Sequence, residues 1–117
     1  MKENIMSDNS LEEIELSIEE AKKMVTKAKS LKSLLSNKNY KALVDEGYFK
    51  EEAIRLVLLK SDPNMESETN QKAIIQAIDG IGSFRQYLHT VLQYGAMAEK
   101  EISAAQEARE ELLAEEL

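Results

Sequence analysis

His89 is the only histidine of the chain and the first residue to test for chemistry. A zinc ligand or a general base on a helix is usually joined by another histidine or a carboxylate three or four residues away. Those positions hold Arg85, Gln86, Leu92 and Gln93, which supply neither a metal ligand nor an orienting carboxylate. His89 is therefore expected to be a packed or surface histidine.

Paired carboxylates recur along the chain, and acid–base catalysis is often built from such pairs. They occur at Glu12-Glu13, Glu19-Glu20, Asp45-Glu46 and Glu51-Glu52. Catalytic pairs sit in apolar clefts that move their pKa values apart, whereas these lie at expected helix starts and on polar faces. Helix capping and solubility account for them.

Other chemistries fail on residue type and spacing. The segment Gly80-Ile81-Gly82 lacks the rest of the dinucleotide-binding fingerprint, and no segment has the pattern of a calcium loop. The chain has no cysteine, which excludes disulfides, thiol catalysis and cysteine-type zinc sites. The sequence predicts a protein that is not an enzyme and that holds no cofactor or metal.

An apolar stripe with regular spacing of three and four residues predicts a long first helix. The stripe comprises Leu11, Ile14, Ile18, Ala21, Val25, Ala28, Lys32 and Leu35, and it is widened on one flank by Met24, Leu31 and Leu34. Lys32 is its single polar member. The unbroken spacing favours one continuous helix with a wide face to bury.

Two capping-box patterns precede or interrupt this stripe. Ser10 with Glu13 predicts that the helix begins near Leu11, because the serine and the glutamate can satisfy free backbone N–H groups there. Ser17 with Glu20 has the same pattern and would leave residues 14–18 as a short extended piece. The continuous helix is preferred on the strength of the stripe.

Two short helices are expected next. Asn37 is an N-cap candidate for the first of them, and Gly47 is expected to end it in a left-handed conformation. The second begins at residues 50–52 and stops before Pro63, which disfavours helix in the preceding residue. Its apolar face is expected at Ala53, Ile54, Val57 and Leu58, broadened by Leu56 and Leu59.

A last helix, capped by Ser67 or Thr69, is expected from about residue 68 almost to the C-terminus. Its stripe comprises Ile74, Ile78, Ile81, Phe84, Leu88, Val91, Gly95, Ala98, Ile102, Ala105 and Leu112. At ~1.5 Å per residue this helix would be roughly 70 Å long, so it either bends or needs a partner for its far half. Asp79 to Gly82 is interpreted as a kink or as a close approach of a neighbouring backbone. Gly95, Ala96 and Ala98 form a small-residue face for close helix packing.

These elements predict an all-α fold. The expected architecture is a long helical hairpin or bundle with two short helices at the connecting corner and coiled-coil-like packing. Residues 1–9 are expected to be a flexible N-terminus, residues 10–98 the helical domain, and residues 99–117 an acidic helical C-terminal arm. Apolar surface left over by this hairpin favours self-association, most simply a dimer that forms a four-helix bundle.

The charge of the chain argues against nucleic acid as a partner. The net charge is −7, whereas nucleic-acid binding needs a basic surface. The lysines at 22, 23, 27, 29 and 32 are expected to be the solvated face of a helix. No signal peptide and no apolar run of ~18 residues is present, so no membrane association and a cytoplasmic location are expected.

Candidate partner-binding residues follow from exposed aromatic and apolar types. Tyr48 and Phe49 are one such pair, with a plug between the two short helices as the preferred alternative. The others are Arg85 and Tyr87 on the last helix and Ile102, Leu112 and Leu113 in the acidic arm.

Residues 30–103 resemble a small helical protein of tailed bacteriophages found among virion assembly genes. The resemblance rests on the segments GYFKEEA, SDPN, IDGIG and RQYL. It implies a phage structural or assembly factor, in the host cytoplasm or the virion, and it assigns no functional residue. A small acidic inhibitor of a host enzyme, acting as a DNA mimic, is the alternative that the net charge leaves open.

Overall fold

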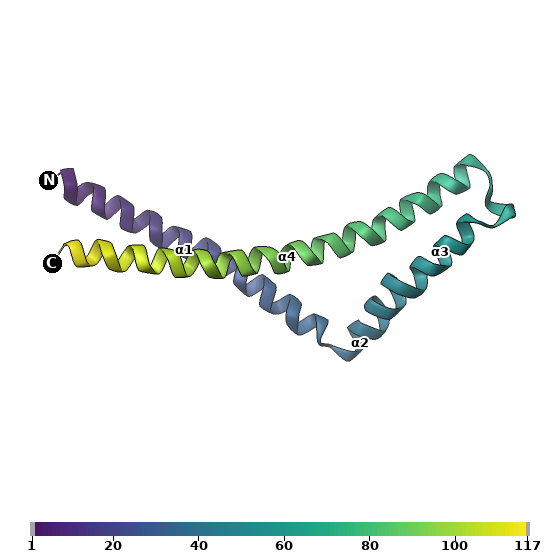
Figure 1. Ribbon diagram of the computed structural model, residues 1–117, viewed down its shortest axis with the longest axis horizontal. Coiled ribbons are helices and arrows are strands. Elements are labelled where there is room, and N and C mark those ends of the chain that lie inside the picture. Colours follow the sequence, from purple (N-terminus) through teal and green to yellow (C-terminus); the bar gives the residue numbers. More distant parts are fainter. Residues whose placement is uncertain (1, 117) are drawn as a thin grey trace. The chain divides into compact units, whose positions relative to one another are not determined.

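The computed structural model describes the backbone of residues 2–116 and the side chains of residues 10–116. The elements are α1 (Lys2–Leu35), α2 (Lys38–Tyr40), the π-helix η1 (Lys41–Glu52), α3 (Ala53–Lys60), the 3-10 turn η2 (Pro63–Met65) and α4 (Glu68–Glu115) (Figure 1). No strand occurs within residues 2–116, and the predicted all-α class is confirmed. The side chains of residues 1–9 lie outside the described part of the chain. The expectation that these residues form a flexible N-terminus therefore stays a prediction.

The chain divides into two compact units. Unit 1 comprises residues 1–30 and 91–117, which are most of α1 and the second half of α4. Unit 2 comprises residues 31–90, which include α2, η1, α3 and the first half of α4. Each unit is therefore built from helices that run in opposite directions.

The predicted stripe of α1 is the buried face of this helix. Ile18, Ala21 and Ala28 are buried, and Leu11, Ile14 and Val25 are half-buried. At the end of the helix, Leu31 is buried while Lys32 is exposed. The chain thus avoids burying the charge of Lys32 by turning the neighbouring leucine inward.

The predicted start of this helix was wrong. The helix begins at Lys2 rather than near Leu11, and both Ser-x-x-Glu patterns lie inside it. The physical reason is that residues 2–10 contain no glycine or proline, so nothing in the backbone stops the helix from extending beyond the first apolar turn.

Residues 38–60 form one helical run, which we call the middle segment, in place of the two short helices expected. The side chain of Asn37 caps it as predicted, because Asn37 Oδ1 accepts hydrogen bonds from the backbone N–H groups of Asn39 (2.9 Å) and Tyr40 (3.0 Å). Gly47 does not end a helix, and no glycine among the described residues has a positive φ.

The π-helical geometry of η1 explains the glycine at position 47. Turns of a π-helix join residues five apart, so the carbonyl group of Ala42 lies close beneath Gly47. A Cβ atom on Gly47 would lie 3.2 Å from the oxygen of Ala42. The glycine therefore relieves crowding inside a helix, a role that its sequence position does not distinguish from a helix stop.

The corner between α3 and α4 has the predicted breaking residues. The Asp62 side chain accepts a hydrogen bond from the backbone of Asn64 (2.9 Å), and Ser67 Oγ accepts one from the backbone of Asn70 (3.1 Å). Ser67, rather than Thr69, is thus the cap of α4. A clamp that sequence reasoning missed comes from Gln71, whose side-chain amide donates hydrogen bonds to the carbonyl oxygens of Lys60 and Met65.

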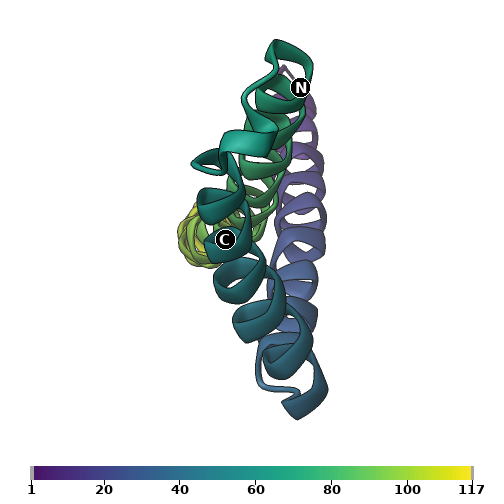
Figure 2. The same cartoon turned by 90° about the vertical axis from the view of Figure 1, so that its right-hand side faces the viewer.

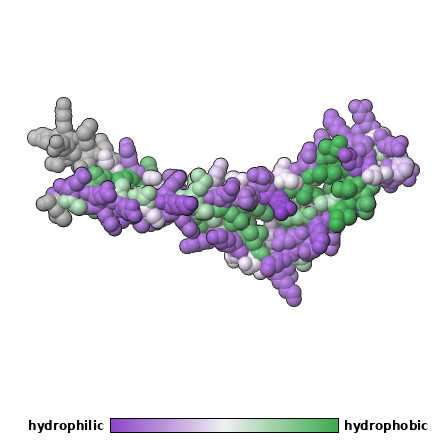
Figure 3. All heavy atoms as spheres, viewed as in Figure 1, coloured by the Kyte–Doolittle hydropathy of each residue, from purple (hydrophilic) through white to green (hydrophobic). Residues whose placement is uncertain are grey.

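The core of unit 2 lies between the middle segment and α4 (Figures 1 and 2). Leu56 of α3 and Ile74 and Ile81 of α4 are buried at its centre. Partly buried residues surround them: Tyr48, Phe49, Ala53, Leu59, Met65 and Ile78. The space-filling view shows hydrophobic side chains gathered over α3 and the facing turns of α4 (Figure 3). Helix α4 runs through Gly80 and Gly82 without a break.

Candidate protein-binding faces

Tyr48 and Phe49 belong to an aromatic cluster at the edge of the unit 2 core. Their ring centroids lie 5.7 Å apart, and both lie near Phe84 of α4, at 6.1 Å and 5.6 Å respectively. Tilted and edge-on arrangements at these distances are favourable for aromatic rings. The two residues are half-buried and join the middle segment to α4. The plug between two short helices was not found, because residues 38–60 form one helical run. Their role in partner binding stays a prediction.

The outer face of the middle segment is apolar and exposed. Leu58 is 68% exposed and Leu43 74%, and Ile54 and Val57 are also exposed. The sequence pattern had placed Ile54, Val57 and Leu58 on the buried face of this helix, and that prediction was wrong. Because α3 is apolar on nearly all sides, its spacing alone could not choose the side that packs. In the structure, the buried side of α3 is the one that carries Leu56, which packs on Ile74 and Ile81.

Unit 1 is held by close contact between α1 and α4. A Cβ atom built on Gly95 would lie closer to Ala28 Cβ than any real contact allows, and 3.5 Å from the carbonyl oxygen of Met24. Gly95 and Ala98 are buried, whereas Ala96 is exposed. The predicted small-residue face is therefore confirmed for Gly95 and Ala98, and it allows the two backbones to approach closely.

The predicted partner-binding residues of the acidic arm take two different positions. Ile102 and Leu112 are half-buried, at the spacing that continues the buried stripe of α4. Leu113 is 46% exposed. Arg85 and Tyr87, in unit 2, are both exposed on α4. The roles of these five residues in binding stay predictions.

One flank of unit 1 forms a hollow that sequence reasoning did not assemble. It is lined by Met24 of α1 and by Tyr94, Met97, Ala98 and Glu101 of α4, with a volume of about 180 Å³. We call these five residues the methionine flank. Met24 is 45% exposed, Tyr94 53% and Met97 55%, while Ala98 is fully buried. Such a surface can bind an apolar partner, because methionine side chains adapt to irregular surfaces.

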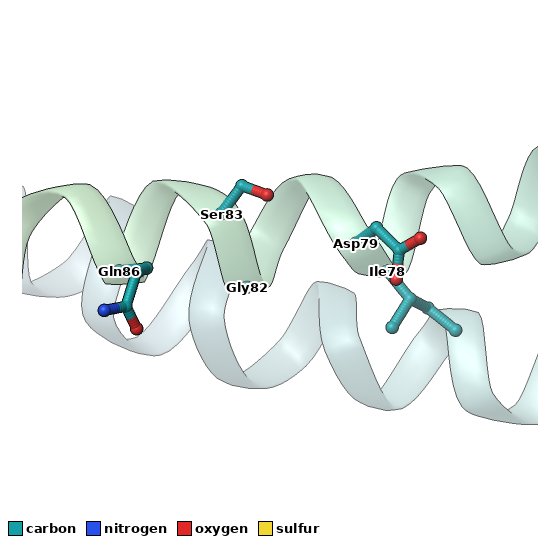
Figure 4. A pocket seen from close by; sticks show the side chains of 5 residues that line it. All are labelled: Ile78, Asp79, Gly82, Ser83 and Gln86. Atoms are coloured by element: carbon teal, nitrogen blue, oxygen red, sulfur yellow. The ribbon is translucent and has the colours of Figure 1, made fainter.

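A second, open hollow lies on one helix only. Its lining residues, Ile78, Asp79, Gly82, Ser83 and Gln86, all come from α4 in unit 2 (Figure 4). The hollow reflects the missing side chain of Gly82, since a Cβ atom there would meet nothing within 4 Å. One carboxylate, one hydroxyl and one amide can form hydrogen bonds here. The residues described contain no group of three or more His, Cys, Asp or Glu side chains that could hold a metal ion.

The charged residues form local pairs on exposed helix surface. Lys23 pairs with Glu20 (3.1 Å), and Arg55 donates two hydrogen bonds to the Glu52 carboxylate, at 2.9 Å and 2.5 Å. These bonds hold the pKa of Glu52 below its ordinary value and raise that of Arg55. Burial, and then the charge of Asp45, raises the pKa of Tyr40. His89 is exposed.

Comparison with known proteins gives no relative. No protein-family model, curated protein or solved structure matches the chain. Within the described residues, none of the helices has the length and apolar character that crossing a membrane requires.

Proposed function

We propose that this chain is a non-enzymatic helical module for protein–protein interaction that acts as an oligomer, as a bacteriophage structural or assembly factor. One observation carries the proposal. Among residues 10–116, nine apolar residues are buried, whereas thirteen large apolar side chains are exposed. Single exposed apolar residues are ordinary, but contiguous groups mark surfaces that bind other proteins.

Seven of the thirteen exposed apolar residues belong to two faces. One group is the outer face of the middle segment, with Leu43, Ile54, Val57 and Leu58. The other is the methionine flank of unit 1. Helices that expose apolar side chains on the face opposite their core are usual in proteins that complete their packing with a second chain. The phage context is part of the proposal and rests on the resemblance of residues 30–103.

Thermal unfolding at different protein concentrations tests this function. An oligomer gains stability by mass action, so its Tm rises with protein concentration. We expect the Tm, followed by far-UV circular dichroism, to increase over a hundredfold range of concentration. A Tm that stays constant over that range would contradict self-association and remove the main support for the proposal.

The charge distribution favours one alternative, an acidic inhibitor that mimics DNA. Residues 10–20 and 99–116, which both belong to unit 1, carry twelve carboxylates and two basic side chains. Such a surface can compete for the basic groove of a nucleic-acid enzyme. Affinity capture from a bacterial lysate separates the two functions. Recovery of a nuclease or polymerase favours the inhibitor, whereas recovery of virion proteins favours the assembly factor.

A further inference from the structure

The two edges of the α1–α4 pair in unit 1 differ in character. The edge with the methionine flank is hollowed and mostly apolar, with buried Ala98 and with Glu101 as the charged residue of its lining. By helical spacing, the opposite edge carries Lys22, Lys29 and Glu99, all exposed. The first edge is therefore the one that offers apolar surface to a further helical layer.

The charges of α1 are divided into two halves. Residues 12–20 contain five glutamates and no basic residue, and residues 22–32 contain five lysines and no acidic residue. The boundary between the halves lies at Ala21, about one helical turn before Met24 of the methionine flank. The apolar hollow and the change of sign therefore lie within about one turn of each other on α1.

This division selects the orientation of a second copy. By helical spacing, Glu20 and Lys27 lie on the same side of α1 as Met24, so two α1 helices side by side in parallel would bring Glu20 against Glu20 and Lys27 against Lys27. In an antiparallel arrangement about an axis at Met24, Glu20 of each copy lies near Lys27 of the other. Complementary charges of this kind fix register and suppress the wrong orientation.

We propose that the methionine flank is the interface of an antiparallel homodimer, in which a second copy of this chain packs its own methionine flank across a twofold axis beside Met24. The proposal rests on the oligomeric function proposed above and specifies the surface and orientation. Each copy contributes two antiparallel helices, so the product is a four-helix bundle with α1 on α1 and α4 on α4. The same patch serves both copies, as a twofold interface requires.

Single cysteines test the orientation, because the chain has no cysteine of its own. Met24→Cys places a thiol beside the axis, where it meets the thiol of the other copy. Ser17→Cys is the matched control, two turns away and exposed on the same side of α1. It lies ~10 Å from the axis along the helix, so the two copies are ~20 Å apart, beyond the reach of a disulfide.

The expected result is that oxidation links Met24→Cys into covalent dimers and leaves Ser17→Cys uncrosslinked, while both reduced variants sediment as dimers. Equal crosslinking of the two variants would show a parallel dimer and overturn the inference. So would a reduced Met24→Cys dimer that oxidation does not link. If the unmodified chain is a monomer, the proposed oligomeric function fails as well. If it is a dimer that Met24→Cys does not crosslink, only the proposed interface fails.

Charge insertion tests the surface independently. We expect Met97→Glu to raise the dimer dissociation constant roughly tenfold or more, because a carboxylate would be buried in the hollow. Leu58→Glu, a matched change on the exposed outer face of α3, is expected to leave the constant within about twofold. Dissociation by Leu58→Glu and not by Met97→Glu would place the interface on unit 2 and overturn the inference.

Discussion

Replacing Gly95 by alanine tests the packing of unit 1 most sharply, because one methyl group acts in two opposing ways. Alanine is the better helix former, and the change alone would stabilise a helix interior by about 1 kcal/mol. The methyl group, however, would overlap Ala28 Cβ and lie 3.5 Å from the carbonyl oxygen of Met24. Carbon atoms in good contact lie roughly 3.5–4.0 Å apart, so α1 and α4 would have to separate at this point.

The cost of that separation exceeds the gain in helix propensity. Overpacking a close contact typically costs about 1–3 kcal/mol, and here both partners are attached directly to helix backbones that cannot rotate away. We therefore expect Gly95→Ala to lower the free energy of unfolding by about 1 kcal/mol after the propensity gain. Gly82→Ala is the matched control, since its Cβ atom would meet nothing within 4 Å. This control should stabilise the chain by up to about 1 kcal/mol.

Urea unfolding followed by far-UV circular dichroism, at one fixed protein concentration, measures both changes. The double variant Ala28→Gly with Gly95→Ala exchanges the methyl group between helices, and it should recover most of the packing loss as a positive coupling energy. Stabilisation of Gly95→Ala equal to that of Gly82→Ala would refute the close approach of the two helices at this position.

Two further predictions concern unit 2. The Gln71 amide donates hydrogen bonds to the carbonyl oxygens of Lys60 (3.0 Å) and Met65 (2.8 Å). Gln71→Met should therefore lower the free energy of unfolding, measured by urea unfolding, by about 1–2 kcal/mol. An unchanged free energy of unfolding would contradict the clamp. Arg55→Gln should raise the pKa of Glu52 toward its ordinary value, as measured by NMR titration, because the guanidinium lowers that pKa in the folded chain. The stabilisation by this pair is present above the pKa of Glu52 in the unfolded chain and is lost as pH falls through the pKa of Glu52 in the folded chain. The free energy of unfolding of Arg55→Gln should therefore decrease less on acidification than that of the unmodified chain. An identical Glu52 titration curve in both proteins would contradict this coupling.

The elements that sequence predicted well are those fixed by local chemistry. The N-cap at Asn37 and the stop before Pro63 depend on a side chain and its nearest backbone neighbours, so their residue types suffice. The buried stripe of α1 was also predictable, because its spacing leaves one continuous apolar face. Only Lys32 departed from it, where Leu31 is buried instead.

The elements that sequence missed depend on tertiary contacts. Gly47 has the sequence context of a helix stop, and only the π-helical crowding with Ala42 shows why a glycine lies inside a helix. The apolar residues of α3 surround the helix, so the choice of Leu56 as its buried residue came from contacts with α4. Spacing within one helix carries no information about either choice.

The candidate binding surface likewise depends partly on local sequence and partly on tertiary contacts. Met24 was recognised as a member of the α1 flank, but Tyr94 and Met97 lie some seventy residues away in the sequence and join it only through helix pairing. The register that brings them together is set by Gly95 against Ala28. A heptad alignment of the two stripes, centred on the small residues, is the sequence signal that could have found this surface.

Sedimentation equilibrium of the unmodified full chain tests the central claim most directly. The account predicts that the mass rises from the 13.2 kDa of one chain toward twice that value as the concentration reaches tens of micromolar. A single species of 13.2 kDa throughout that range would contradict the claim that this chain works by covering its exposed apolar faces with a second copy.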